Sequence, residues 1–98
     1  MFVTVSLYRV RTGEEDALIA LYEDWERRQQ PQAGGYLSGE LLRSINDPRE
    51  FIAIMHFESM EAARALGNDP EQTAWFQRIV SLNDVPPILN EYRREWSS

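Results

Sequence analysis

The sequence predicts an α+β fold in which a four-stranded antiparallel sheet carries helices on one face. Three observations lead to this prediction. Four stretches are rich in β-branched and aromatic residues, amphipathic stretches with helical spacing lie between them, and Gly, Pro, Asn and Asp gather at the boundaries. A chain of 98 residues has the size of one domain, so we expect a single domain over residues 1–98.

The first strand is predicted over Phe2–Arg11, where the side chains alternate between two faces. Both faces are at least half apolar: one carries Val3, Val5 and Leu7, and the other carries Thr4, Ser6, Tyr8 and Val10. Two apolar faces indicate a central strand that is covered on both sides.

A helix is predicted to follow, opened by a capping box between Thr12 and Glu15. Its apolar stripe has the spacing i, i+3, i+4, i+7 and consists of Leu18, Leu21, Tyr22 and Trp25. Pro31 and the pair Gly34-Gly35 then break the helical pattern, so the helix should end in the segment that contains them.

The second and third strands are predicted over Tyr36–Ile45 and Phe51–Phe57. The link between them, residues 46–49, is dense in turn formers, so the two strands should form an antiparallel hairpin. Ser59 is suited to cap a short helix that runs to about Leu66, after which Gly and Asn are typical of a helix end.

A second capping box, in residues 69–72, should open the last helix with Pro at its first position. The apolar stripe of this helix consists of Trp75, Phe76, Ile79 and Val80. Pro86 and Pro87 then lead into a last strand at Ile88–Trp96. The order β-α-β-β-α(α)-β is the ferredoxin-like split βαβ arrangement, with the helices on one face of the sheet.

The other face of such a sheet needs a different cover, because its strands are apolar on both sides. This face would carry Val3, Val5, Leu7, Ile52 and Ile54. A second copy of the same sheet is the simplest cover, so we expect a homodimer. His56, the one histidine, alternates with Phe57 and should point toward this face rather than toward the helices.

Composition excludes several classes of function. Sixteen acidic against 10 basic residues give a net charge of −6, which argues against nucleic-acid binding. Charged residues make up 27% of the chain and no apolar run approaches the roughly 20 residues that span a bilayer, so we expect no membrane partner. The absence of cysteine excludes thiolate metal sites and a Cys nucleophile, and one histidine is too few for a metal site. The N-terminus lacks a signal-peptide pattern, so we expect a cytoplasmic protein.

Several short segments share their pattern with one known family: Tyr8–Glu15, Gly35–Leu37 with Leu41–Ser44, Glu50–Ala63, Asn68–Pro70 with Trp75-Phe76, and Pro86-Pro87. In these segments the chain resembles the antibiotic biosynthesis monooxygenase family. The resemblance extends over nearly the whole chain. It implies a dimeric α/β barrel in which each subunit keeps a pocket between its own sheet and helices.

The resemblance also implies an activity. Members of the family oxygenate aromatic polyketides without metal or flavin, oxidise quinols or degrade haem. Their better-known active residues are an Asn, a Trp and a His, and the corresponding positions here are Ser6, Phe57, and Leu66 or Gly67. Leu and Gly cannot ligate haem iron, so we expect no haem cofactor, and no other cofactor or metal.

The predicted substrate pocket is rich in aromatic side chains and consists of Ser6, Tyr8, Tyr22, Trp25, Phe57, Trp75 and Phe76. Ser6 and Tyr8 are the candidates for catalysis, because their hydroxyls could hydrogen-bond an enolate or phenol oxygen. The same aromatic residues could equally be core packing. Two hypotheses therefore remain: a cofactor-independent monooxygenase acting on a small aromatic, phenolic or quinol-like substrate, or a non-catalytic dimeric protein that binds small molecules or serves as an accessory.

Overall fold

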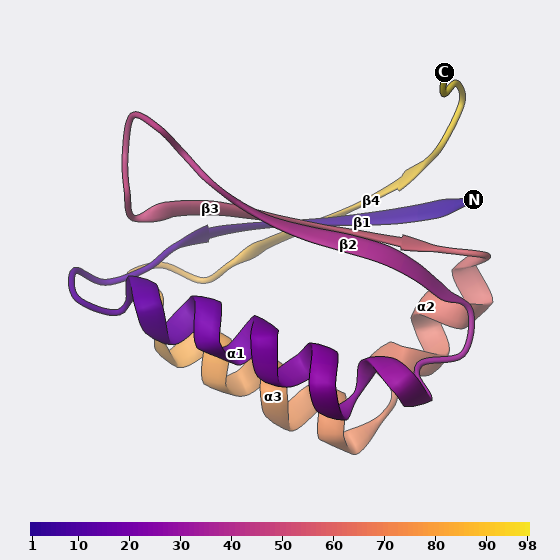
Figure 1. Cartoon of the computed structure of the whole chain (residues 1–98), viewed down its shortest axis with the longest axis horizontal. Coiled ribbons are helices and arrows are strands. Elements are labelled where there is room, and N and C mark those ends of the chain that lie inside the picture. Colours follow the sequence, from indigo (N-terminus) through magenta and orange to yellow (C-terminus); the bar gives the residue numbers. More distant parts are fainter.

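The computed structural model describes residues 1–98 and shows a sheet with three α-helices packed on one side (Figure 1). The elements are β1 (Phe2–Arg9), α1 (Glu15–Arg28), the 3₁₀ turn η1 (Gln30–Gln32), β2 (Tyr36–Arg43), β3 (Glu50–Phe57), α2 (Met60–Gly67), α3 (Pro70–Ser81) and β4 (Ile88–Arg93). This architecture confirms the predicted α+β ferredoxin-like fold. None of the helices is both long and apolar enough to cross a membrane.

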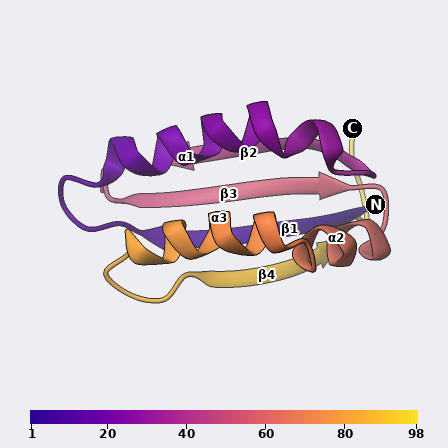
Figure 2. The same ribbon diagram turned by 90° about the horizontal axis from the view of Figure 1, so that it is seen from below.

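The strands lie in the order β2-β3-β1-β4, and all neighbouring pairs are antiparallel. The first strand is therefore central, as its two apolar faces predict. Seen from the helix side, α1 runs along the β2 side of the sheet and α3 runs along the β1–β4 side (Figure 2). The space between these two layers holds the core.

No helix covers the other face of the sheet. The register places Val5 opposite Ile54 and Asn90, and Leu7 opposite Ile52 and Ile88, so these side chains share that face. Ile52 is 39% exposed and Ile88 is 56% exposed. The face that the sequence marks as needing a partner is thus apolar and open to solvent in the single chain.

The core lies between the sheet and the two long helices. Its buried side chains are Tyr8, Val10, Leu18, Trp25, Phe51, Ala53, Trp75 and Ile79. Leu18 and Ile79 are fully enclosed, one from each long helix. The helical spacing in the sequence therefore identified the faces of α1 and α3 that meet the sheet, except at Val80, which belongs to the predicted α3 stripe but is 36% exposed.

Two of the three α-helices begin with the cap that the sequence predicts. Ser59 and Asp69 cap α2 and α3 as predicted, through side-chain bonds from the N–H groups of Ala62 and Glu71. The predicted capping box at Thr12 is wrong, because α1 begins at Glu15 without a side-chain cap. A turn closed by the Glu14 N–H and Arg11 carbonyl, with Gly13 at φ 92°, occupies the position that the box would need.

Three strands are shorter than predicted. The first ends at Arg9 because Val10 makes an isolated bridge to Asn83 instead of continuing the ladder. The second ends at Arg43 rather than Ile45, because the Ser44 hydroxyl accepts the next turn's N–H groups and starts the turn early. The last ends at Arg93 rather than Trp96.

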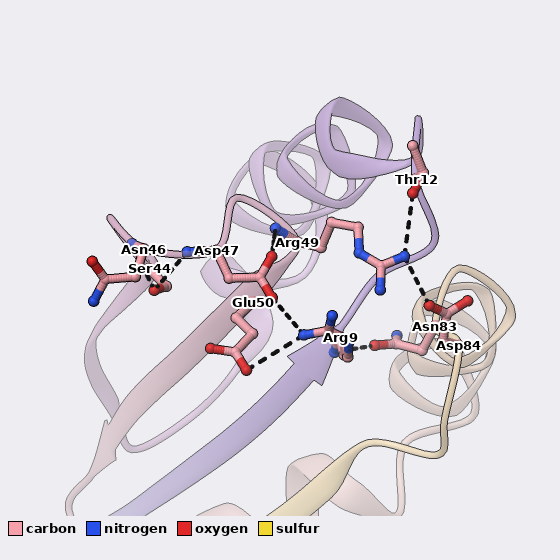
Figure 3. A network of polar contacts seen from close by, with 9 residues as sticks. All are labelled: Arg9, Thr12, Ser44, Asn46, Asp47, Arg49, Glu50, Asn83 and Asp84. Carbon is pink, nitrogen blue, oxygen red and sulfur yellow. Dashed lines mark hydrogen bonds and ion pairs between the residues drawn. The ribbon is translucent and has the colours of Figure 1, made fainter.

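A polar network holds together the end of the sheet farthest from the chain termini (Figures 1 and 3). Arg9 pairs with Asp47 in the β2–β3 turn at 2.5 Å, and Arg49 pairs with Asp84 after α3 at 3.0 Å. Asn83 is buried; its side-chain oxygen accepts the Arg9 N–H at 2.9 Å and its amide donates to the Ile79 carbonyl at 2.7 Å. The network fixes the end of β1 against the β2–β3 turn and the segment after α3.

Candidate functional site

A cleft of about 550 Å³ lies between the sheet and the helices α2 and α3. Six of the seven predicted pocket residues line it: Ser6, Tyr8, Tyr22, Phe57, Trp75 and Phe76. Alternation along β1 turns Ser6 and Tyr8 toward the helices, and the register places Thr4 and Ser6 beside Glu91 and Leu89 of β4. The cleft thus joins residues from six elements of the chain.

Trp25, the seventh predicted residue, lies beside this cleft but does not line it. It borders a second cleft of about 630 Å³ between α1 and β2, which shares Tyr22 and Met55 with the first. Its indole N–H, which as a buried donor needs a partner, donates to the Gln72 side-chain oxygen at 2.6 Å. Because the Gln72 side chain accepts this bond, it does not complete the predicted capping box, in which it would have bonded the N–H group at the start of its own helix.

The aromatic walls of the 550 Å³ cleft are held by bonds and by ring packing. The Trp75 indole donates to the Leu21 carbonyl at 2.8 Å, and its ring meets the Tyr22 ring edge-on at a centroid distance of 5.0 Å. Phe57 ends β3 and packs edge-on against Tyr36 at 5.8 Å. These contacts fix the walls on both sides of the space, so the cleft is preformed.

Tyr8, the most buried polar residue that lines the cleft, belongs to a pair of phenols. The hydroxyl oxygens of Tyr8 and Tyr22 lie 2.6 Å apart, which is a hydrogen bond between strand β1 and helix α1. Burial raises the pKa of Tyr8, against the lowering effect of hydrogen bonds to Tyr22 and Ser6. Burial, and then the neighbouring Tyr8, raise the pKa of Tyr22 well above its ordinary value. Both phenols are therefore neutral hydrogen-bond donors at physiological pH.

Glu91 of β4 is the one charged side chain that lines the cleft. The Arg64 guanidinium holds it through two hydrogen bonds, one of them 2.9 Å long, and lowers its pKa. The remaining polar lining is neutral: Thr4, Ser6, Gln72, Thr73, Gln77 and Asn90. No group of three or more His, Cys, Asp or Glu side chains is placed to hold a metal ion. The cleft can thus accept a planar ring and donate hydrogen bonds to its oxygen atoms.

The antibiotic biosynthesis monooxygenase family model matches residues 1–78. The chain belongs to this family. A search of curated protein sequences gave no match.

Solved structures share the fold over nearly their whole length. A conserved protein from Methanosarcina mazei has 11% identity, covers 96% of this chain and 92% of its own, and gives a TM-score of 0.87. Rv0793 from Mycobacterium tuberculosis has 15% identity, coverage of 99% and 97%, and a TM-score of 0.85. A mutant of SnoaB, a cofactor-independent oxygenase from Streptomyces nogalater, has 15% identity, coverage of 98% and 94%, and a TM-score of 0.81. At such identities the likeness shows the fold alone.

The positions at which the resemblance implies active residues all face the 550 Å³ cleft. Ser6, Phe57, Leu66 and Gly67 line it together, although they come from β1, β3 and α2. His56 lies on the opposite face, paired with Val3, and its Nδ1 is 3.3 Å from the Arg94 guanidinium. The cleft therefore presents hydroxyl and apolar groups where the resemblance implies an amide, an indole and an imidazole.

Sequence reasoning missed the β4 side of the cleft and the second cleft. Leu89 and Glu91 lie opposite Ser6 and Thr4, so the strand period could have assigned them to the helix side once β4 was placed beside β1. The link between Trp25 and Gln72 joins residues 47 positions apart, and no local pattern predicts it.

Proposed function

We propose that this chain is a monooxygenase that oxidises a small phenolic or quinol-like aromatic compound without a metal or flavin. The observation that carries the proposal is the cleft of about 550 Å³, whose aromatic walls end at the Tyr8–Tyr22 hydroxyl pair. Its volume lies within the range of roughly 300–1,000 Å³ typical of small-molecule sites. Membership of the monooxygenase family supports the reaction class.

The chemistry needs a substrate that supplies all the electrons. The ionised substrate passes an electron to oxygen, and its reacting carbon then forms a bond to one oxygen atom. The O–O bond breaks, a carbonyl forms, and the second oxygen atom leaves as water with the two hydrogens that the substrate loses. Four electrons move from the substrate to O₂, so no external reductant is required. The protein would contribute hydrogen bonds from Ser6 and Tyr8 to the enolate oxygen, and walls that exclude water.

Oxygen uptake tests this function directly. The protein, dialysed against a chelator, is mixed with 1,8-dihydroxyanthrone and with a series of naphthohydroquinones, and heat-denatured protein corrects for autoxidation. We expect protein-dependent uptake, with one atom of ¹⁸O from labelled O₂ in the product. Tyr8→Phe should lower the rate at least tenfold, whereas Tyr36→Phe, which deletes a hydroxyl in the neighbouring cleft, should not. Rates equal to the denatured control across the series would refute the function.

The second candidate is a binding or accessory protein that performs no chemistry. The observation in its favour is the set of side chains at the usual active positions, Ser6, Phe57 and Leu66, which differ from those of characterised members. Under this function, quenching of the tryptophan fluorescence would show tight binding of the same quinols, while oxygen uptake would stay at the denatured control.

We also propose that the open face of the sheet is the contact surface of a homodimer. It carries the apolar side chains of Val5, Leu7, Ile52 and Ile54, and no helix of the same chain covers it. Sedimentation at micromolar concentration should show one dimeric species, because an exposed sheet face of this kind is costly to leave in water. A stable monomer under those conditions would contradict the assembly.

A further inference from the structure

One hydroxyl proton of the phenol pair in the 550 Å³ cleft is not used in the hydrogen bond between the two phenols. Tyr8 and Tyr22 carry two such protons, and their mutual bond of 2.6 Å uses one. Whichever phenol donates in that bond, the other keeps an O–H that can donate elsewhere. Neither phenol makes a second bond to a carbonyl or carboxylate. The hydrogen bond with Ser6 lowers the pKa of Tyr8, which is the effect of a hydroxyl that donates to the Tyr8 oxygen and leaves the phenol's own proton free. A donor aimed at this wall of the cleft is therefore available to a ligand.

We propose that the Tyr8–Tyr22 pair is an oxyanion-binding element, and that the cleft takes its phenol or enol ligand as the anion. The inference rests on the proposed function in one respect, which is that the ligand is an aromatic compound. Tyr8 donates to the ligand oxygen, and Tyr22 donates to the Tyr8 oxygen. Hydrogen bonds in such a chain polarise one another, so the outer bond is stronger than one from a single phenol. Tyr22 is thus a positioning residue that acts through Tyr8.

The competition for the shared proton favours an ionised ligand. Burial makes Tyr8 and Tyr22 weaker acids than tyrosine in water. A phenol or enol that is more acidic than they are leaves the proton on the tyrosine side of the hydrogen bond and carries the charge itself. The resulting bond is charge-assisted, which makes it about twice as strong as one between neutral groups. The site therefore selects for acidity of the ligand as well as for its shape.

No other group in the cleft is placed to remove the ligand's proton. Glu91 is the one carboxylate that lines it, and the bidentate contact with Arg64 holds it as half of a nearly neutral pair. The other titratable groups near Tyr22, among them Tyr36, Glu23 and Glu26, border the second cleft. With no base available, the ligand must ionise in water or on entry. The class that fits is the phenols and enols with pKa values below that of tyrosine.

4-Nitrophenol is a suitable probe, because its phenolate has its own visible absorption band. We expect a bound pKa about one unit below that of the free probe, which corresponds to tenfold tighter binding of the anion. Tyr8→Phe should return the bound pKa to the free value, and Tyr22→Phe should remove about half of the shift. Tyr36→Phe should leave it unchanged. A bound pKa equal to or above the free value in the parent protein would overturn the inference.

A second comparison needs no variant. 4-Nitroanisole has almost the same shape as 4-nitrophenol but cannot ionise. Above the pKa of the probe, the parent protein should bind 4-nitrophenol at least tenfold more tightly than 4-nitroanisole, and below it the two should bind alike. Equal affinities at both pH values would refute anion selection.

The outcomes separate this inference from the proposed function. A lowered pKa of bound 4-nitrophenol, without oxygen uptake from any quinol, would support the oxyanion site and refute the monooxygenase function. Oxygen uptake by a protein whose bound probe shows a raised pKa would do the reverse.

Discussion

Phe57 decides whether the aromatic cleft is a binding space or part of the packed core. Its side chain is 3% exposed, as enclosed as a core residue, yet it borders the 550 Å³ cleft and stands where the resemblance places an active tryptophan. Phe57→Ala removes the ring and leaves the backbone of β3 unchanged. The loss of stability then depends on whether the void left by the ring is closed or joins the cleft.

The two cases differ in their expected cost. Losing the burial of the ring costs about 1.5–3 kcal/mol in either case. A closed void of about 100 Å³ adds about 2.4 kcal/mol at about 24 cal/mol per Å³, which brings the total to about 3.9–5.4 kcal/mol, near the upper end of the 3–5 kcal/mol usual for Phe→Ala in a core. A void that opens into the cleft is filled by water, so that second contribution is lost. We therefore expect Phe57→Ala to lower the free energy of unfolding by about 2 kcal/mol.

Leu18→Ala is the control, because Leu18 is fully enclosed and lines neither cleft. Leu→Ala in a closed core costs about 2.7–5 kcal/mol. Phe57→Ala should thus lower the free energy of unfolding by less than Leu18→Ala does, although Phe is the larger side chain. Urea unfolding at one fixed protomer concentration measures both, and tryptophan quenching by a quinol series should weaken in Phe57→Ala alone. A loss above 4 kcal/mol, without quenching in the parent protein, would make Phe57 core and leave the enzyme hypothesis with little support.

Three further measurements test the polar network at the end of β1 and the expected absence of haem binding. Asn83→Ala should lower the free energy of unfolding by about 2 kcal/mol in urea, because two backbone groups lose their buried partner. The pKa of Asp47 is lowered from 3.8 by the hydrogen bond from the Arg49 N–H and then by the hydrogen bond from the Arg9 side chain. The free energy of unfolding should therefore fall as the pH drops below 3.8 and through the lowered pKa, and Asp47→Asn should flatten that part of the curve of stability against pH. Haem should give no stoichiometric Soret shift, because Leu66 and Gly67 offer no axial ligand; a sharp shift with product formation under a reductant would contradict this.

The fold was predictable because each of its determinants is local. Alternation in β1, the stripe at Leu18 and Trp25, and the caps at Ser59 and Asp69 each depend on residues within one or two turns of one another. The errors also have local causes. At Thr12 a glycine-containing turn competed with the capping box, and at Ser44 a hydroxyl ended the ladder two residues early. Both involve side chains that can bond the backbone in more than one conformation.

The candidate site was less predictable, because its shape depends on contacts between distant parts of the chain. Helical spacing turns Trp25 toward the sheet, but the bond to Gln72 and the edge-on contact with Tyr36 decide which of two clefts its ring borders. The same limit applies to Tyr8 and Tyr22. Each pattern placed one phenol on the helix–sheet interface, and only the assembled fold brings their oxygens to 2.6 Å.

That distance changes the chemistry expected of the chain. Judged by the resemblance alone, Ser6 and Phe57 stand where an Asn and a Trp are implied, which would suggest a loss of function. In the assembled cleft, a pair of neutral phenols lies beside Ser6 and can donate to a ligand oxygen from the same wall. Hydrogen-bond donors directed at a developing oxyanion are the contribution that such a reaction needs most from a protein. The donor in this chain can therefore be a tyrosine pair built from a strand and a helix, where the resemblance implies an asparagine.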